Sequence, residues 1–168
     1  MEDIRLISPA QGETVEICAP FQKEFYEADK FRDIKKIIKK ILKAKKAQGV
    51  FSIPAPAVFS WEPSDCEAVL EISENGDFSD AQTVTAQGGR AEIYNLKKHA
   101  KYYWRVNGGE ARSFFTDGIM PRWIFAEGME NIRDFGGEKN TDGVEIKQGL
   151  IFRGIRMEYD GAEKASVH

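Results

Sequence analysis

Apolar and polar residues alternate over most of the chain, which is the pattern of half-buried β-strands. The first such stretch covers residues 4–20 and is interrupted at Ser8-Pro9 and at Gln11-Gly12, so it predicts two short strands or one kinked strand. Short strands at this spacing, with no helix between the later ones, predict a fold that is mainly β and arranged as a β-sandwich. The later alternating stretches lie at residues 58–61, 68–73, 83–85, 91–94, 101–106 and 112–115.

Between residues 21 and 47 the apolar residues recur three and four positions apart, which places them on one face of an α-helix. Acidic residues come early in this stretch and most lysines come late, which suits the helix dipole. We therefore expect one amphipathic helix of about twenty-five residues, inserted after the first strand of the sandwich. Its apolar positions are Phe21, Phe25, Ala28, Phe31, Ile34, Ile37, Ile38, Ile41 and Leu42.

This predicted helix carries ten lysines and arginines against four acids, and is therefore strongly basic in a chain of net charge −3. One interpretation is a surface helix that docks on anionic lipid or on an acidic partner. The other is a helix that covers a β domain, with its lysines simply solvated, and the early acids and scattered aromatics favour this second interpretation. The lysines concerned are Lys35, Lys36, Lys39, Lys40 and Lys43.

The composition of the 168 residues is ordinary for a globular protein, with 42% hydrophobic and 30% charged residues. The net charge gives no reason to expect a nucleic-acid partner. We expect a cytoplasmic protein, because no apolar run approaches a membrane span and the N-terminus lacks the features of a signal peptide. The two cysteines and two histidines lack metal-ligand spacing, so we expect no metal site and no cofactor. We expect free thiols, with a disulfide as the alternative if the protein is exported.

The most specific sequence motif lies near the C-terminus, at residues 131–137, 141–143 and 146–154. Paired glycines after Asp134 and a second turn at Asp142-Gly143 predict a turn followed by a strand or hairpin over residues 144–152. In the order and spacing of its residues, this motif resembles the beginning of the catalytic domain in the bacterial tyrosine-phosphatase family related to dual-specificity phosphatases. The motif residues that carry the resemblance are Asn131, Arg133, Asp134, Gly136, Gly137, Asp142, Gly143 and Arg153.

The resemblance implies hydrolysis of phosphotyrosine or related phosphate esters through a cysteinyl-phosphate intermediate, without a metal. That chemistry needs a Cys-x-x-x-x-x-Arg loop, which lowers the thiolate pKa and holds the phosphate, and an aspartate as general acid. Neither cysteine fits, because Glu24 stands six places after Cys18 and Ile72 six places after Cys66. The match spans only residues 130–153, so we expect this chain alone to be inactive.

For Arg133 and Asp134 we favour an internal salt bridge or turn-holding hydrogen bonds over direct phosphate contact. Arg153 is suited equally to facing the phosphate site and to capping a strand end. The sequence departs from the family's usual pattern at Glu138, where an aromatic residue is common, and at Gly154, where serine is common.

A second resemblance covers residues 59–116, which are similar to fibronectin type III modules. The resemblance rests on Trp61 in a strand, the segment 78–81 after the next strand, and Leu96 six residues before Tyr102. The resemblance implies an immunoglobulin-like β-sandwich with a corner at which the Tyr102 hydroxyl satisfies backbone. We expect Trp61, Tyr102 and Trp104 in the core and not on a sugar-stacking surface, and we note a departure at Lys98, where proline is usual.

The predicted organisation is therefore a sandwich over residues 1–118, with the helix inserted at about 21–47, and then residues 119–168 as a linker and the truncated opening of an α/β phosphatase domain. We expect the tail from residue 154 to be poorly ordered. Expected partners are a phosphoprotein substrate or another protein, and the incomplete domain is expected to self-associate or to leave residues 144–152 disordered. The alternative is a stand-alone binding or surface-docking module without enzymatic activity.

Overall fold

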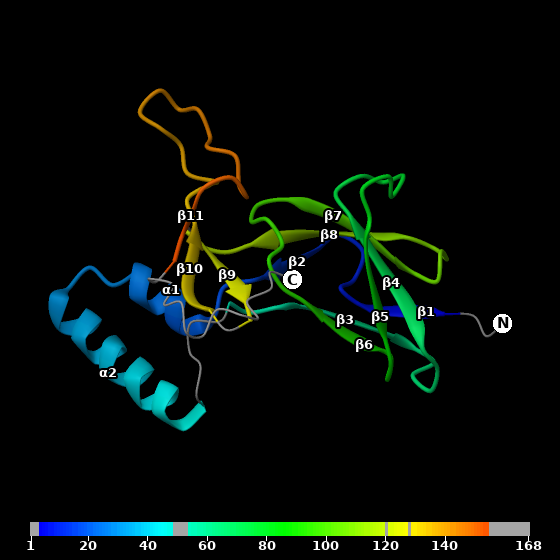
Figure 1. The fold of residues 1–168 in the computed structure, drawn as a ribbon, viewed down its shortest axis with the longest axis horizontal. Helices are drawn as coiled ribbons and strands as arrows, with labels where there is room; N and C mark the ends of the chain where they lie inside the picture. Colours follow the sequence, from blue (N-terminus) through cyan, green and yellow to red (C-terminus); the bar gives the residue numbers. More distant parts are fainter. Residues whose placement is uncertain (1–3, 49–53, 120, 128, 155–168) are drawn as a thin grey trace, which may run out of the picture. The chain divides into compact units, whose positions relative to one another are not determined.

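The computed structural model describes residues 4–48, 54–119, 121–127 and 129–154 (Figure 1). The fold is mainly β, as predicted. The chain divides into two compact units, the first made of Met1–Ile17 and Pro56–Asp117 and the second of Cys18–Ala55 and Gly118–His168. The tail predicted to be poorly ordered lies, apart from Gly154, outside the described residues.

The first unit consists of two sheets, and its strands confirm the predicted ones. The short strands expected in the N-terminal segment are both present, and they join different sheets. The three-stranded sheet has the order β1 (Arg5–Ser8), β3 (Ala57–Glu62), β6 (Arg90–Ile93). The five-stranded sheet has the order β2 (Glu13–Glu16), β8 (Arg112–Asp117), β7 (Lys101–Val106), β4 (Ala68–Ser73), β5 (Gln82–Ala86), and only its β2–β8 pair is parallel.

The core of the first unit joins the two sheets. Phe59 of β3, Trp104 of β7 and Phe114 of β8 are completely buried. The ring of Phe59 lies edge-on to both others, with centroid distances of 5.2 Å to Trp104 and 5.5 Å to Phe114. Alternate residues of β3 and β7 are buried, because successive side chains of a strand point to opposite faces. The alternation read from the sequence therefore selects the residues that hold the two sheets together.

The predicted tyrosine corner is formed. Tyr102 is buried, and its hydroxyl accepts a hydrogen bond from the backbone N–H of Lys97 at 3.0 Å. Leu96 packs in the same core. Because Trp61 and Trp104 are buried as well, neither offers a face for stacking on a sugar.

The helical segment differs from the prediction, since two helices replace the single long one. Helix α1 covers Pro20–Tyr26 and α2 covers Phe31–Gln48. The carbonyl of Lys30 accepts the N–H groups of Asp33 and Ile34 at 2.8 and 3.1 Å, so α2 begins anew at this point. Asp29 lies within the break and favours non-helical backbone, and Asp33 suits the first turn of a helix. The three-and-four spacing of apolar residues continues across the break, which is why the pattern predicted one helix.

Helices α1 and α2 belong to the second compact unit, together with the C-terminal strands, whereas the sequence placed the helix within the sandwich domain. A compact unit is not by itself a segment that folds alone. The predicted domain boundaries therefore stay a prediction.

The second unit also contains a three-stranded antiparallel sheet of order β11 (Phe152–Arg153), β10 (Met129–Asp134), β9 (Arg122–Ala126). Ile124, Ala126 and Ile132 form a small buried cluster on this sheet. The long loop between β10 and β11 leaves the sheet and returns to it (Figure 1).

A continuous strand over residues 144–152 is not formed, and that part of the prediction is wrong. The expected turn at Asp142-Gly143 is present, and beyond it a single bridge joins Lys139 and Glu145. The chain then turns again at Gly149, which has a φ of +86° that favours glycine. This second turn interrupts the strand before β11.

Candidate functional site

The two halves of the C-terminal motif meet in the second unit. The N–H of Phe135 donates to the carbonyl of Ile151 at 3.0 Å, and the N–H of Gly137 donates to the carbonyl of Ile146 at 2.7 Å. Strands β10 and β11 continue this pairing. Residues 131–137 and residues 146–153 therefore pair to form one structural element.

The centre of this element is the carboxylate of Asp134, which is completely buried. Its Oδ2 accepts from Arg122 Nη2 at 2.6 Å, from Arg122 Nε at 3.2 Å and from the N–H of Gly149 at 2.7 Å. Its Oδ1 accepts from the N–H of Gly136 at 2.8 Å. We call these four residues the Asp134 network. Asp134 thus holds the internal salt bridge and the turn hydrogen bonds that the sequence analysis favoured for it.

Arg122 is a residue that the sequence analysis placed in a linker and gave no role. Its side chain is 6% exposed and its charge is neutralised by Asp134 across the β9–β10 pair. Strand pairing of β9 with β10 was the missing information, because the two residues are directly opposite only in that register. A lone arginine in a short apolar stretch gave no signal of this partner.

The first glycine of the pair after Asp134 is required by close packing. A Cβ on Gly136 would lie 2.2 Å from the Cα of Gln148 and 2.5 Å from the carbonyl oxygen of Lys147, far inside van der Waals contact. Gly137 has a φ of +88°, a conformation that side chains rarely adopt. Both glycines are therefore explained by the way the two halves of the motif pack together.

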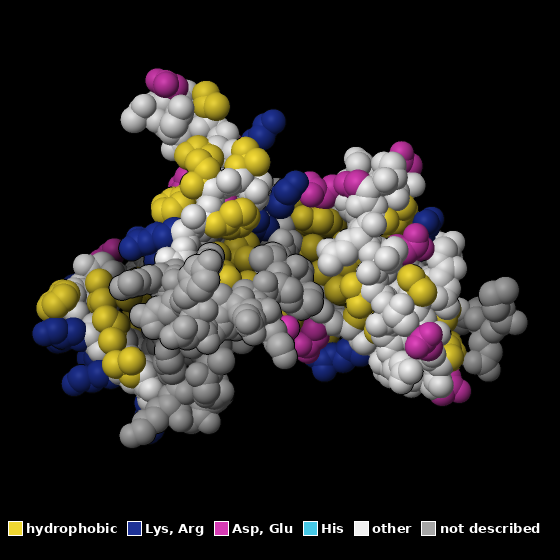
Figure 2. Space-filling model, viewed as in Figure 1, with side chains coloured by type: hydrophobic (Ala, Val, Ile, Leu, Met, Phe, Trp, Pro, Cys, Tyr) yellow, Lys and Arg dark blue, Asp and Glu magenta, His cyan; other side chains and the backbone are white. Residues whose placement is uncertain are grey.

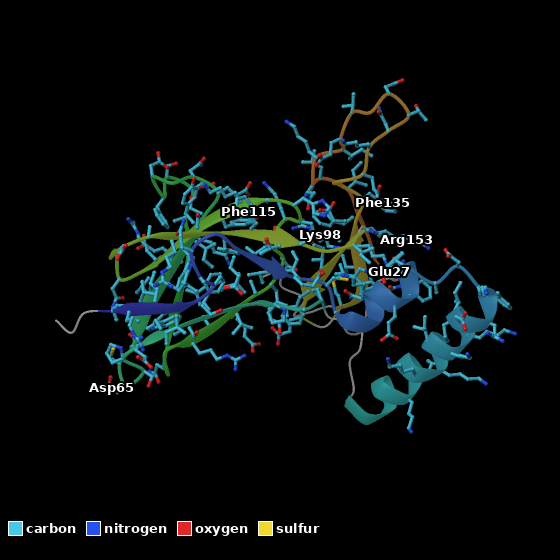
Figure 3. All side chains as sticks on the ribbon, turned by 180° about the vertical axis from the view of Figure 1, so that it is seen from behind. Glu27, Asp65, Lys98, Phe115, Phe135 and Arg153 are labelled. Atoms are coloured by element: carbon cyan, nitrogen blue, oxygen red, sulfur yellow. The ribbon has the colours of Figure 1, made fainter. Side chains whose placement is uncertain are left out.

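The face of the sheet opposite the Asp134 carboxylate carries a row of cationic and aromatic side chains. Arg133 is directly opposite Trp123 on β9 and Arg153 on β11, and directly opposite residues share a face. The Arg133 guanidinium lies 4.7 Å from the centroid of the Trp123 ring, and its Nη2 donates to Asn131 Oδ1 at 3.0 Å. Arg153, labelled in Figure 3, is exposed. Two neighbouring guanidinium groups on one face can attract an anion.

The remaining motif residues hold the tip of the loop. Asn140 Oδ1 accepts the N–H groups of Asp142 at 3.0 Å and Val144 at 2.9 Å, which is an Asx-type turn. Gly143 completes it with a φ of +80°. Asp142 is exposed. These residues shape the turn and bring no further chemical group to the arginines.

Large apolar side chains are exposed around the loop and β11. Exposed fractions run from 38% at Ile146 to 68% at Leu150. Figure 2 shows yellow side chains gathered over this part of the molecule, and Figure 3 labels Phe135 at the base of the loop. Soluble monomers rarely gather so many exposed apolar side chains in one place unless something binds there. We call this set the apolar patch: Phe135, Val144, Ile146, Leu150, Ile151 and Phe152.

The five lysines singled out from the sequence lie on α2 and are exposed or paired on the surface. Lys36 Nζ lies 3.4 Å from Asp33 Oδ1, and Lys40 Nζ lies 2.8 Å from Glu24 Oε1. Among the residues that the structure describes, Lys35, Lys39 and Lys43 have no carboxylate within 4.0 Å. They leave uncompensated positive charge along the helix.

The candidate thiols and metal ligands do not form a cluster in the described part of the chain. Cys18 is buried, Cys66 is exposed and neither forms a disulfide. His99 Nε2 lies 3.2 Å from Asp117 Oδ1, and His168 lies outside the described residues. No group of three or more metal-ligating side chains occurs among the described residues. Within the same ranges, no helix is long and apolar enough to cross a membrane.

Comparisons with protein-family models, with curated proteins and with solved structures find no match to this chain.

Proposed function

We propose that this chain is the non-catalytic N-terminal region of a cysteine-dependent protein phosphatase of the bacterial tyrosine-phosphatase family. The observation that carries the proposal is the Asp134 network. Residues quoted from the two halves of the motif, Asp134, Gly136 and Gly149, contact one another directly. A chance similarity of sequence would give no reason for Asp134 and Gly149, fifteen positions apart, to be joined by a hydrogen bond.

The apolar patch supports the same proposal. β11 is one of the two edge strands of its sheet, and the side chains around it are exposed. An exposed edge with apolar neighbours is what the opening of a larger sheet presents before later elements cover it. In the proposed parent these elements belong to the remainder of the catalytic domain.

The catalytic chemistry would come from that remainder. A thiolate in a Cys-x-x-x-x-x-Arg loop attacks the phosphorus of a phosphotyrosine or a related ester, the phosphoryl group passes to sulfur, and a protonated aspartate donates its proton to the leaving oxygen. Water then releases the phosphate. The residues of this chain hold the front of that fold in shape, and Arg133 and Arg153 add positive charge that attracts the substrate.

For the first unit we propose a fibronectin type III-like sandwich that positions a substrate protein or another partner. Two observations support it. One is the division of the strands into sheets of three and five, the fifth being the short parallel strand β2. The other is the hydrogen bond between the Tyr102 hydroxyl and the backbone of Lys97, a feature of immunoglobulin-like corners.

The test is hydrolysis of an aryl phosphate in the presence of a metal chelator. This chain is compared with the same chain extended to the stop codon of its own gene, and with the extended chain in which the newly supplied cysteine of the loop is replaced by serine. We expect activity in the extended protein alone. Inactivity of the extended protein, or activity that survives the cysteine replacement, would contradict the proposal.

The second candidate is a stand-alone binding module, and the apolar patch is the observation that favours it. In that case the patch faces another protein, and in the absence of this partner the isolated chain is expected to associate with itself, as it would with an incomplete domain. Light scattering is expected to show concentration-dependent association that Leu150→Lys abolishes and Val69→Lys, a matched change of an exposed apolar residue in the first unit, leaves intact. A monomer at all concentrations would contradict self-association.

A further inference from the structure

The apolar side of α2 is only partly covered. Phe31, Ile38 and Leu42 are exposed by 70%, 41% and 57%. Residues three, four and seven apart lie on one side of a helix, so these three form a line along it, which we call the apolar line. Figure 2 shows yellow side chains along α2 with dark blue ones beside them. Ile34 and Ile37, further round the helix, are half-buried.

A row of lysines runs beside the apolar line. Lys35, Lys39 and Lys43 follow at steps of four residues, which rotate only slowly around a helix. Lys35 Nζ lies 4.7 Å from the centroid of the Phe31 ring, so the lysine row directly adjoins the apolar line. None of these three lysines has a carboxylate within 4.0 Å among the described residues. Over its whole length α2 carries eight basic residues and one acidic residue.

Helix α2 contacts α1 through another side, by an exposed ion pair. Lys40 Nζ contacts both carboxylate oxygens of Glu24 in α1, at 2.8 and 2.9 Å. This ion pair lies on the side of the helix away from Leu42, since positions two apart face in different directions. The apolar line and the lysine row can therefore engage a surface without separating α2 from α1.

We propose that α2 docks on the surface of an anionic lipid bilayer. The apolar line enters the boundary between headgroups and acyl chains, and Lys35, Lys39 and Lys43 contact lipid phosphates. A membrane interface accepts apolar side chains and cations along the same plane. An acidic surface without an apolar groove would neutralise the lysines but leave Phe31 and Leu42 in water, whereas a bilayer interface takes up both kinds of side chain.

The test is vesicle flotation with the whole chain. Vesicles of phosphatidylcholine are compared with vesicles of phosphatidylcholine and phosphatidylglycerol at a ratio of about 3:1, in about 0.05 M and about 0.5 M salt. We expect binding to the anionic vesicles at low salt, weaker binding at high salt, and little binding to the neutral vesicles.

Two variants separate the lysine row from the apolar line. Lys39→Gln with Lys43→Gln is expected to lower the partition coefficient roughly 25-fold, because each lysine near the surface contributes about fivefold. Leu42→Gln is expected to lower it roughly tenfold. Glutamine keeps a good helix propensity, and circular dichroism checks that the helix content is unchanged. The matched control, Lys101→Gln with Lys139→Gln, removes the same charge from exposed positions outside α2 and is expected to bind normally.

Three results would overturn the proposal. One is equal binding to neutral and anionic vesicles. The second is binding that the α2 variants and the control reduce alike. The third is absence of vesicle binding combined with retention on soluble poly-glutamate, which would assign the lysine row to an acidic macromolecule.

Discussion

Replacement of Asp134 by asparagine is the most informative single change in the second unit. The substitution keeps the size of the side chain but removes its charge and replaces one oxygen by an NH₂ group. Four donors, two from Arg122 and one each from Gly136 and Gly149, converge on the native carboxylate. In either orientation the new NH₂ group faces at least one of these donors.

The expected loss of stability in Asp134→Asn comes mainly from the guanidinium of Arg122, which loses its charged partner. Because the Arg122 side chain is only 6% exposed, water can do little to solvate its charge once the carboxylate is gone. Removing one partner of a buried ion pair costs about 3 to 5 kcal/mol, whereas a lost backbone hydrogen bond costs about 1 kcal/mol. A loss of about 3 to 5 kcal/mol is a large part of the stability of a small domain. We therefore expect the sheet β9–β10–β11 to open locally.

Hydrogen exchange read by mass spectrometry resolves this unit from the first one. Peptides covering β9, β10 and β11 are expected to lose protection by between about a hundredfold and a few thousandfold, while peptides of β3 and β7 keep theirs. Asp142→Asn is the matched control, since it makes the same chemical change at an exposed loop tip and is expected to cost less than about 0.5 kcal/mol. Unchanged protection in Asp134→Asn, or equal loss in both variants, would refute the role given to the network.

Three further predictions concern packing and pH. Gly136→Ala is expected to lower the thermal unfolding temperature of the second unit more than Gly143→Ala, because a Cβ at Gly136 meets backbone at 2.2 Å while Gly143 has open space and only the strain of its φ, about 1 to 2 kcal/mol; equal shifts would contradict this reasoning. Phe114→Ala is expected to cost about 3 to 5 kcal/mol in a denaturant titration, and Phe115→Ala, whose side chain is largely exposed, less than about 1 kcal/mol. The hydrogen bonds from Arg105 hold the pKa of Glu71 below its ordinary value of 4.5, so this pair stabilises the protein above that pH, and its contribution is lost as the pH falls through the lowered pKa. Thermal unfolding of Glu71→Gln should therefore differ from the parent at neutral pH and converge with it in acid, and a difference that persists in acid would point to packing instead.

The first unit was largely predictable because its strands bury alternate side chains. Trp61, Tyr102 and Trp104 were assigned to the core from their places in strands, and all three are buried. The corner hydrogen bond of Tyr102 is the one that the resemblance to fibronectin type III modules implied. Local pattern and tertiary packing agree here, so the pattern alone was sufficient.

The second unit was less predictable because long-range contacts decide its conformation. The helix break at Asp29-Lys30 is invisible to apolar periodicity. The turn at Gly149 depends on the acceptor supplied by Asp134, fifteen residues earlier. Arg122 gains its role only when β9 pairs with β10. The motif residues were identified from sequence, but their partners were not.

Residues 129–154 are proposed to form the edge of a larger fold. The most direct measurement is hydrogen exchange of residues 144–152 in this chain and in the chain extended to the stop codon of its gene. Exchange in this segment is expected to slow markedly in the extended protein, because later elements would cover the apolar patch and the edge of β11. Equally fast exchange in both proteins would contradict the claim and leave the patch as a surface that faces a partner.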